Sequence, residues 1–205
     1  MIHERVGEYG TYYGSYFDES DYMTDSQMKT NAEYVFKYLS NEGWTKEAIS
    51  GILGNMQAES NINPGCWQSM LIGNMEGGYG LVQWTPASKY INWCTGDASE
   101  MDNNLARICY EVKNELQWIP TNTYDFSFKD YVKSKNSPSY LASAFLKNYE
   151  RAGVEVEDKR RSNAEAWYKY LNGKDYEGGS GTIPYISKKK KAFKFYLFKR
   201  KDLIK

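Results

Sequence analysis

The chain has 205 residues, 41% of them hydrophobic and 25% charged, which suits one compact domain with short appendages. Basic and acidic residues number 26 each, so the net charge is zero, and the single histidine is His3 near the N-terminus. A lone histidine in that place argues against a His-ligated zinc peptidase and against Ser-His-Asp and Cys-His hydrolases, which all need a well-placed imidazole. Hydrolysis by this chain would therefore rest on carboxylates, and we expect no metal and no cofactor.

The two ends of the chain are expected to lie outside the folded core. Residues 1–23 are rich in Tyr, Gly and acidic side chains without a helical period, which predicts an extended leader. We place the folded domain at 24–172 and a Gly-rich linker at 173–187. The tail, 188–205, carries nine basic residues and one acidic residue. It is either a disordered end or a segment that binds an anionic wall polymer, and because the rest of the chain is acidic we expect no nucleic acid partner. We see no secretion signal and no stretch long enough to span a membrane.

Capping residues and apolar residues at helical spacing predict a mainly α fold. Thr24 with Gln27 forms a capping box that begins a first helix, Gly43 ends that helix, and Thr45 caps a second one. Residues 61–84 lose the helical period and carry several glycines, which predicts loops with a small β-hairpin. Further helices are expected after Thr85-Pro86, over 101–116, after Ser137-Pro138 and through 164–171.

Glu59 is a carboxylate on a face that should be buried. The second helix carries its apolar stripe at Ile52 and Met56, and Glu59 continues that stripe at helical spacing. It also lies at the C-terminal end of the helix, where the helix dipole disfavours negative charge. Burial and the dipole both raise the pKa of a carboxyl group, which suits a general acid near neutral pH. The alternative is a half-exposed Glu at a fraying helix end.

Three stretches of the chain resemble a known family: Gly54–Ser60 (GNMQAES), Gly78–Ser88 (GYGLVQWTPAS) and Tyr149–Arg151 (YER). A Glu-Ser pair that ends a helix, followed by a Gly-Leu-x-Gln segment, resembles the lysozyme and lytic transglycosylase superfamily. The residues of the three stretches resemble the phage tail lysozyme family still more closely, and this resemblance covers about residues 24–171. The resemblance implies a lysozyme-like helical domain, mainly α (α+β), with a small β-hairpin beside the catalytic cleft.

The resemblance also implies roles for individual residues. Glu59 would be the general acid that protonates the glycosidic oxygen of the peptidoglycan glycan strand. Gln83 matches a position that lines the saccharide cleft, and Trp84 beside it either stacks on a pyranose ring or belongs to the core. Ser60 would orient Glu59 or contact sugar, or simply end the helix. Tyr149 resembles the tyrosine that hydrogen-bonds the catalytic carboxyl in transglycosylases, although no Ala-Tyr-Asn triplet occurs in this chain.

A glycosidase usually needs a second carboxylate as nucleophile or base. Glu76, on the presumed hairpin, is the first candidate, although it fits a solvated loop residue as well, and Asp97 is a weaker candidate. If neither serves, the N-acetyl group of the substrate can assist, as the transglycosylase resemblance implies. Glu150 is interpreted as structural, in a pair with Arg151 or Arg160.

The function implied by the resemblance is that of a muramidase that cleaves the MurNAc–GlcNAc strand of peptidoglycan at a phage tail tip and so opens the host cell wall. This implies a location in the virion or at the cell wall, with other tail proteins as partners. Two alternatives stay open: a lytic transglycosylase that forms an anhydro product, and a tail or carbohydrate-binding module that keeps the fold without the chemistry.

Overall fold

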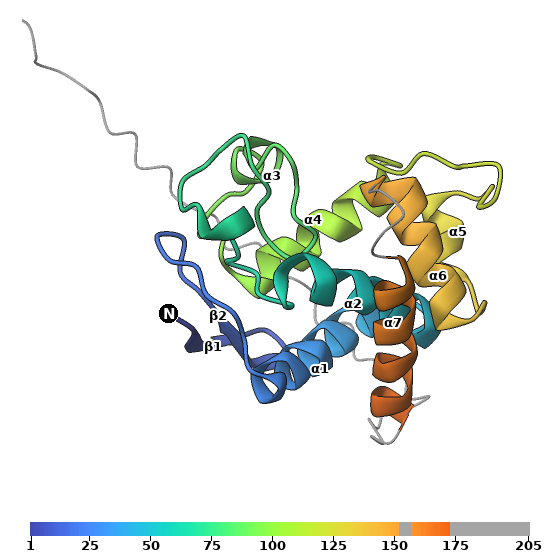
Figure 1. Ribbon diagram of the computed structural model, residues 1–205, viewed down its shortest axis with the longest axis horizontal. Helices are drawn as coiled ribbons and strands as arrows, with labels where there is room; N and C mark the ends of the chain where they lie inside the picture. The colour runs from blue at the N-terminus through green and yellow to red at the C-terminus, as the bar shows by residue number, and fades with distance from the viewer. Residues whose placement is uncertain (152–156, 173–205) are drawn as a thin grey trace, which may run out of the picture. The chain divides into compact units, whose positions relative to one another are not determined.

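The computed structural model describes residues 1–151 and 157–172, which lie in one compact unit, Met1–Lys174. Helices dominate the described residues and a two-stranded sheet accompanies them, so the mainly α class is confirmed (Figure 1). No helix in these ranges is long and apolar enough to cross a membrane. The predicted linker and tail lie outside the described residues. The elements in chain order are β1 (His3–Gly7), β2 (Gly10–Gly14), α1 (Asp25–Asn41), α2 (Lys46–Ser60), the short turn η1 (Gln68–Met70), α3 (Ser88–Ile91), α4 (Met101–Lys113), α5 (Phe128–Lys133), α6 (Pro138–Phe145), the wide turn η2 (Leu146–Glu150) and α7 (Glu157–Asn172).

The predicted helix starts are confirmed where a side chain caps the helix. The Thr24 hydroxyl accepts a hydrogen bond from the backbone N–H of Gln27, and the Gln27 side chain accepts one from the N–H of Thr24, so the capping box begins α1. Thr45 caps α2 with its side chain, and Ser137 caps α6, whose first residue is Pro138. Each cap satisfies a backbone N–H that the first turn of a helix leaves without a partner.

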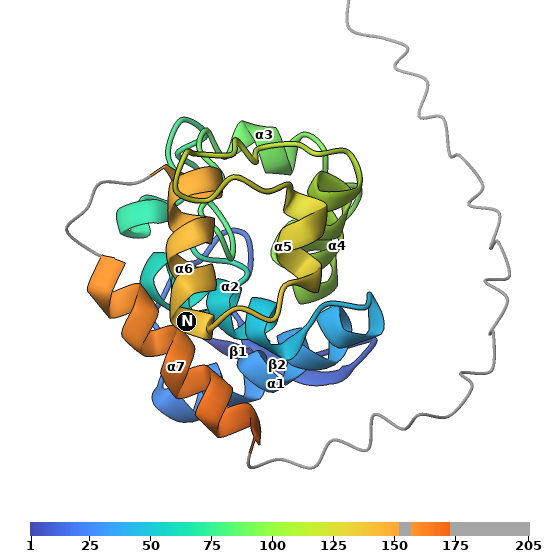
Figure 2. The ribbon, with the colours of Figure 1, turned by 90° about the vertical axis from the view of Figure 1, so that its right-hand side faces the viewer.

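α2 is the helix against which α1, α6 and α7 pack (Figure 2). Its apolar side chains have no exposed surface: Ile49, Ile52, Leu53 and Met56. Gly54 permits the close approach of α7, since a Cβ atom there would lie 2.5 Å from the carbonyl oxygen of Arg160. Gly51 does the same for α6, because a Cβ atom there would lie 2.9 Å from the Cβ of Leu141. The half of α2 that leads to Glu59 is therefore held between two helices.

The N-terminal residues are folded, which corrects the leader predicted for 1–23. β1 and β2 form an antiparallel hairpin, and β2 packs on α1 (Figure 1). The backbone of Tyr13 exchanges two hydrogen bonds with the side chain of Asn31 on α1, at 2.7 and 2.8 Å. Tyr12 on the same strand is 2% exposed. The stretch lacks a helical period because it is a hairpin, and tyrosines supply much of its buried surface.

The hairpin predicted within residues 61–84 is not found there. This stretch, described throughout, contains η1 and isolated bridges that join Tyr79 to Trp67 and to Trp84. α3 also begins at Ser88, later than the predicted start at Thr85-Pro86. The prediction failed because short-range backbone hydrogen bonds in successive turns, together with a few side-chain acceptors, satisfy this region in place of a strand ladder.

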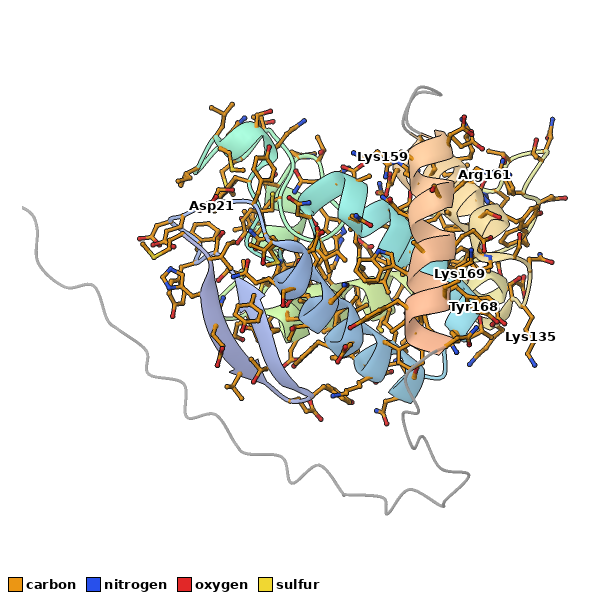
Figure 3. All side chains as sticks on the ribbon, turned by 60° about the horizontal axis from the view of Figure 1, so that its bottom comes forward. Asp21, Lys135, Lys159, Arg161, Tyr168 and Lys169 are labelled. Carbon is orange, nitrogen blue, oxygen red and sulfur yellow. The ribbon has the colours of Figure 1, made fainter. Side chains whose placement is uncertain are left out.

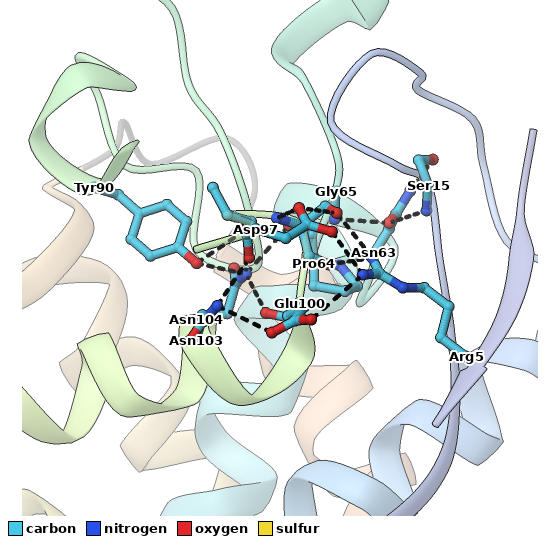
Figure 4. Close-up of polar contacts among 12 residues, drawn as sticks. Arg5, Ser15, Asn63, Pro64, Gly65, Tyr90, Asp97, Glu100, Asn103 and Asn104 are labelled. Carbon is cyan, nitrogen blue, oxygen red and sulfur yellow. Dashed lines mark hydrogen bonds and ion pairs between the residues drawn. The ribbon is translucent and has the colours of Figure 1, made fainter. Parts of the chain in front are cut away.

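Two buried asparagines hold the loops between α2 and α4 (Figure 4). The Oδ1 atom of Asn63 accepts hydrogen bonds from the N–H groups of Ser15 at 3.1 Å and Gly65 at 3.0 Å. The Oδ1 atom of Asn104, on α4, accepts a hydrogen bond from the N–H of Leu81 at 3.0 Å. These contacts pair backbone groups that would otherwise be buried without a partner. They fix the loop that follows Glu59 to both the N-terminal segment and α4.

Candidate active site

Glu59 lies in the last turn of α2, where Asn61 adopts a left-handed conformation and ends the helix. Its side chain is 21% exposed. It is thus neither fully buried, as its place on the apolar stripe predicts, nor free at a fraying helix end. Its carboxylate accepts a hydrogen bond from the Nη2 atom of Arg160 on α7. This arrangement keeps part of the carboxylate open to a substrate and holds the rest in a fixed position.

Arg160 joins two carboxylates that come from different parts of the chain. Its side chain is only 4% exposed and points into the unit, while its neighbours Lys159 and Arg161 lie exposed on α7 (Figure 3). Its Nη1 atom lies 2.7 Å from Oε2 of Glu150, the last residue of η2. The two carboxylates, Glu59 and Glu150, thus meet the same guanidinium group, and we call the three residues the Glu59–Arg160–Glu150 cluster.

Glu150 is the more deeply buried of the two acids, with a side chain only 6% exposed. Burial raises the pKa of this carboxyl well above its usual range, and the negative charge of Glu59 raises it further, while Arg160 acts in the opposite direction. The interpretation of Glu150 as the partner of Arg160 is confirmed. Arg151, the other suggested partner, donates instead to the carbonyl of Gln117 at 2.7 Å.

Ser60 and Gln83 support the loop beside Glu59. The Ser60 hydroxyl is buried and contacts the carbonyl of Leu81 at 2.9 Å, which ties the end of α2 to the segment that carries Gln83. The Nε2 atom of Gln83 lies 3.0 Å from the carbonyl oxygens of Cys66 and Gly80, and Gln83 itself has a left-handed backbone. Ser60 therefore links the end of α2 to the loop that carries Gln83, and a contact of Gln83 with sugar stays an expectation from the resemblance.

Trp84 and Tyr149 belong to the core and do not contact Glu59. Trp84 is 3% exposed, stacks on Tyr90 with ring centroids 4.4 Å apart, and donates its Nε1–H to Glu111 at 3.1 Å. The Tyr149 hydroxyl donates to Oε2 of Glu111 at 2.5 Å. The core alternative for Trp84 is therefore what the geometry supports. The bond expected from Tyr149 to the catalytic carboxyl is made to Glu111 instead, because α4 brings that acid to the tyrosine.

Glu111 is a buried acid that the sequence analysis missed. It is 1% exposed, lies on α4, and accepts a hydrogen bond from Nε of Arg107 one turn earlier at 2.8 Å. A signal was available, since Glu111 follows the buried Ile108 at helical spacing, as Glu59 follows Met56. Burial raises the pKa of Glu111, although hydrogen bonds from Tyr149 and Arg107 act against the rise.

The two candidates for a second carboxylate have other surroundings. Glu76 is exposed, and its backbone N–H donates to Oδ1 of Asn74. Asp97 forms an ion pair with Arg5 of β1 at 2.8 Å and accepts hydrogen bonds from Ser99 (Figure 4). Burial opposes the ionisation of Asp97, but the Ser99 hydrogen bonds and the Arg5 charge outweigh it, so its pKa lies below the usual value. Asp97 thus fastens the N-terminal hairpin, and the acid that meets Glu59 is Glu150.

Two hollows lie elsewhere on the described residues. One of about 230 Å³ is bordered by α1, α2 and α7 and lined by residues that include Gln57 and Trp167. Another of about 470 Å³ is lined by residues that include Tyr124 and Arg151. Glu59 lines neither of them, so the carboxylate geometry and not a deep pocket marks the candidate active site. Among the described residues, no group of three or more His, Cys, Asp and Glu side chains is placed to hold a metal ion.

Comparison with known proteins agrees with the motifs around this site. The family described as phage tail lysozyme matches residues 30–171, which include all three members of the cluster. The chain belongs to the phage tail lysozyme family. This phage tail lysozyme domain is also similar to Morphogenesis protein 1 of Bacillus phage B103, with 45% identity over 166 residues. The match covers 80% of this chain and 45% of that protein, so the chain spans less than half of the relative's length.

Proposed function

We propose that this chain is a peptidoglycan-degrading glycosidase with Glu59 as its general acid. The observation that carries the proposal is the environment of Glu59: it is a partly exposed carboxylate at the end of α2 that contacts Arg160, and Arg160 also contacts a second, buried acid. A general acid must be reachable by the leaving oxygen and must be held in place, and a partly exposed carboxylate that accepts a hydrogen bond from a buried arginine meets both demands.

The substrate we propose is the MurNAc–GlcNAc strand of bacterial peptidoglycan. Membership of the phage tail lysozyme family supports this substrate, and similarity to a phage morphogenesis protein supports a place in the virion. In this role the enzyme acts at the phage tail tip, opens the host cell wall, and has other tail proteins as neighbours. The basic residues of 188–205 are suited to an anionic wall polymer.

Cleavage begins when Glu59 gives its proton to the glycosidic oxygen as the C–O bond breaks. In the hydrolase that we propose, water then attacks the anomeric carbon and loses a proton to a base. A lytic transglycosylase is the second candidate. The observation that favours it is that Asp97, one of the two candidates for a second carboxylate, is held in an ion pair with Arg5 and so is not free to act as a base. A transglycosylase needs no second carboxylate, because Glu59 acts first as acid and then as base while a hydroxyl of the sugar attacks.

Clearing of Gram-positive cell walls by the wild type and by Glu59→Gln tests the proposal. We expect the variant to lose clearing while it keeps the fold, since Gln retains the size of Glu and can still accept from Arg160. Activity equal to that of the wild type would end the assignment of Glu59, and an inactive wild type would favour a non-catalytic tail module.

Mass spectrometry of the digested glycan separates the two reactions. Reducing-end muramic acid means that water attacked, whereas a product lighter by one water is the anhydro sugar of a transglycosylase. Glu76→Gln belongs in the same experiment, because an unchanged rate would remove Glu76 from the mechanism.

A further inference from the structure

We propose that Glu150 is a positioning residue that shares a single proton with Glu59 across the Glu59–Arg160–Glu150 cluster, and so stores the proton that the general acid uses. The inference rests on the proposed function of Glu59 and adds a role for an acid that makes no contact with the substrate. It concerns how Glu59 comes to be protonated at the pH at which the enzyme works.

The charges of the cluster require one proton. Two ionised carboxylates and one guanidinium would leave a net negative charge in a site where Arg160 is 4% and Glu150 is 6% exposed. Taking an uncompensated charge out of water is unfavourable, and two carboxylates that share a site do not both ionise readily. One proton on the pair makes the cluster neutral, and the two acids then titrate as a unit.

Among the described residues, the groups that interact with the pair add no second positive charge. Asn55 of α2 is neutral and accepts a hydrogen bond from Nη1 of Arg160 at 3.1 Å. Burial raises the pKa of the Cys66 thiol to about 11, and the negative charge of Glu59 adds to the rise. Burial also raises the pKa of Tyr131 far above its usual value, and the negative charge of Glu150 adds to the rise. Both groups are therefore neutral near pH 7. Lys147, which lies in η2 with Glu150, is paired with Glu157 at 3.3 Å.

The contacts of Glu150 place the proton on it in the free enzyme. Among the described residues, no N–H or hydroxyl group hydrogen-bonds to either oxygen of Glu150, and Arg160 makes an ion-pair contact with one of them. A buried ionised carboxylate would need such donors for both oxygens. A protonated Glu150 instead can donate to the carboxylate of Glu59, because the two nitrogens of one guanidinium group, Nη1 and Nη2 of Arg160, hold the two carboxylates side by side. Glu59, with its partial exposure to water and its bond from Arg160, is the better place for the negative charge.

Substrate binding would reverse this distribution. A glycan strand that covers Glu59 removes its water, so the ionised form of Glu59 becomes unfavourable and the proton crosses the hydrogen bond from Glu150. Glu150 is then ionised and keeps the contact with Arg160. Glu59 passes the proton to the leaving oxygen as the C–O bond breaks, and the pair regains a proton from the attacking water or sugar hydroxyl. Arg160 contacts both acids already, so no side chain has to move.

The variant Glu150→Gln tests the proposal. Gln keeps the size of Glu, its amide oxygen can face Arg160, and its amide N–H can donate to Glu59, but it cannot give up a proton. Glu59 would then titrate alone beside Arg160, and a positive neighbour lowers the pKa of a carboxyl. We expect the alkaline limb of the kcat profile on soluble glycan fragments to move down by about one pH unit or more, which is about a tenfold loss of kcat on that limb, with KM unchanged.

Glu111→Gln is the matched control. It also replaces a buried acid that contacts an arginine, but Glu111 bonds to Arg107 and Tyr149 and not to Glu59. We expect the pH profile of this variant to follow that of the wild type. A profile of Glu150→Gln that coincides with that of the wild type, while Glu59→Gln is inactive, would overturn the role of Glu150 and leave the proposed function in place. An active Glu59→Gln would overturn the proposed function itself.

A second measurement does not depend on activity. Glutamate labelled with ¹³C at the side-chain carboxyl reports protonation of each acid in an NMR titration. Because burial also raises the pKa of Glu111, the signal of Glu111 is first identified as the one that Glu111→Gln removes. We expect the wild type to show a second carboxyl that is still protonated well above the ordinary Glu pKa of about 4.3, and we expect this second signal to be missing in Glu150→Gln but present in Glu111→Gln. Titration of both Glu59 and Glu150 near the ordinary value in the wild type would overturn the proposal.

Discussion

Glu111 and Glu150 are both buried acids, yet their surroundings differ. Glu111 accepts hydrogen bonds from Arg107 of its own helix, from Tyr149 and from the Trp84 indole, and the last two fasten α4 to the core. Glu150 contacts one arginine that it shares with Glu59. The first arrangement satisfies a carboxylate with several donors, which is typical of a structural acid. The second leaves an acid with few donors beside another acid, which is typical of a site that handles protons.

The raised pKa of Glu111 predicts how its contribution to stability varies with pH. A carboxyl whose pKa is higher in the folded state binds more protons there than in the unfolded state, so the free energy of unfolding falls as pH rises above about 4.3. Thermal unfolding of the wild type and of Glu111→Gln between pH 4 and 7 measures this effect. We expect the Tm of the wild type relative to the variant to decrease as pH rises. A difference that is constant or grows with pH would contradict the raised pKa.

At the residue scale, the sequence predicted on which face of a helix a side chain lies better than it predicted which side chains it contacts. The apolar stripe of Ile52 and Met56 predicted that Glu59 lies on the face of α2 that meets the core, because helical spacing is a local property, but the side chain is 21% exposed and not buried as expected. Its contact with Arg160 spans 101 residues and depends on how α7 crosses α2, which no local pattern encodes. The same limit explains Tyr149, whose hydroxyl meets the acid that tertiary packing brings to it.

At the scale of elements, helices with side-chain caps were predictable and the sheet was not. A capping residue and the spacing of apolar residues both act within one or two turns, and they identified the starts of α1, α2 and α6. The hairpin at the N-terminus depends on packing against α1 and on a hydrogen bond to Asp102 of α4, and its one large buried side chain, Tyr12, is of a type that also suits an exposed segment. The loops held by Asn63 and Asn104 were predicted to contain a hairpin because loops and tight hairpin turns both favour glycine.

The N-terminal hairpin is expected to stabilise the fold through Arg5. Its side chain is 10% exposed, pairs with Asp97, and donates to the hydroxyl and carbonyl of Ser99 at 2.8 and 2.9 Å. We expect Arg5→Ala to lower the free energy of unfolding by about 1.5–3 kcal/mol, as for hydrogen bonds to charged groups. Val6→Ala is the control, since Val6 is 79% exposed and should change stability by no more than about 0.5 kcal/mol. Equal effects in urea unfolding would show that the hairpin is not held by this contact.

The contact between α2 and α7 predicts a second pair of variants. A Cβ atom at Gly54 would lie 2.5 Å from the carbonyl oxygen of Arg160, whereas one at Gly51 would meet Leu141 and Tyr131 at 2.9 Å. We expect both alanine variants to be less stable by about 1–3 kcal/mol, more than the 0.5–1 kcal/mol that Ala gains over Gly in a helix. Gly54→Ala should also lose activity per folded molecule, because it displaces Arg160, while Gly51→Ala should keep it. Denaturant unfolding and assays on the folded fraction measure the two effects, and full activity in Gly54→Ala would contradict the role given to this contact.

At the scale of the whole molecule, the chain separates into the unit Met1–Lys174 and the unit Asp175–Lys205. All members of the Glu59–Arg160–Glu150 cluster lie in the first unit, as does the whole segment that matches the phage tail lysozyme family. Family membership was predictable because its motifs are short and continuous in sequence. The nine basic residues of 188–205 belong to the second unit, so the candidate catalytic residues and the concentrated positive charge lie in different parts of the chain.

This division predicts that removal of residues 175–205 separates catalysis from attachment to the wall. On soluble glycan fragments the shortened chain should keep its kcat/KM, because every contact of the cluster described above lies within Met1–Lys174. On whole cell walls its activity should fall, and the loss should be largest at low salt, where the attraction of a cationic segment to anionic polymers is screened least. A full-length chain with Gln in place of the nine basic residues of 188–205 keeps the length and removes the charge, so it should behave like the shortened chain. Loss of activity on soluble fragments by the shortened chain would show instead that residues 175–205 are needed for the fold.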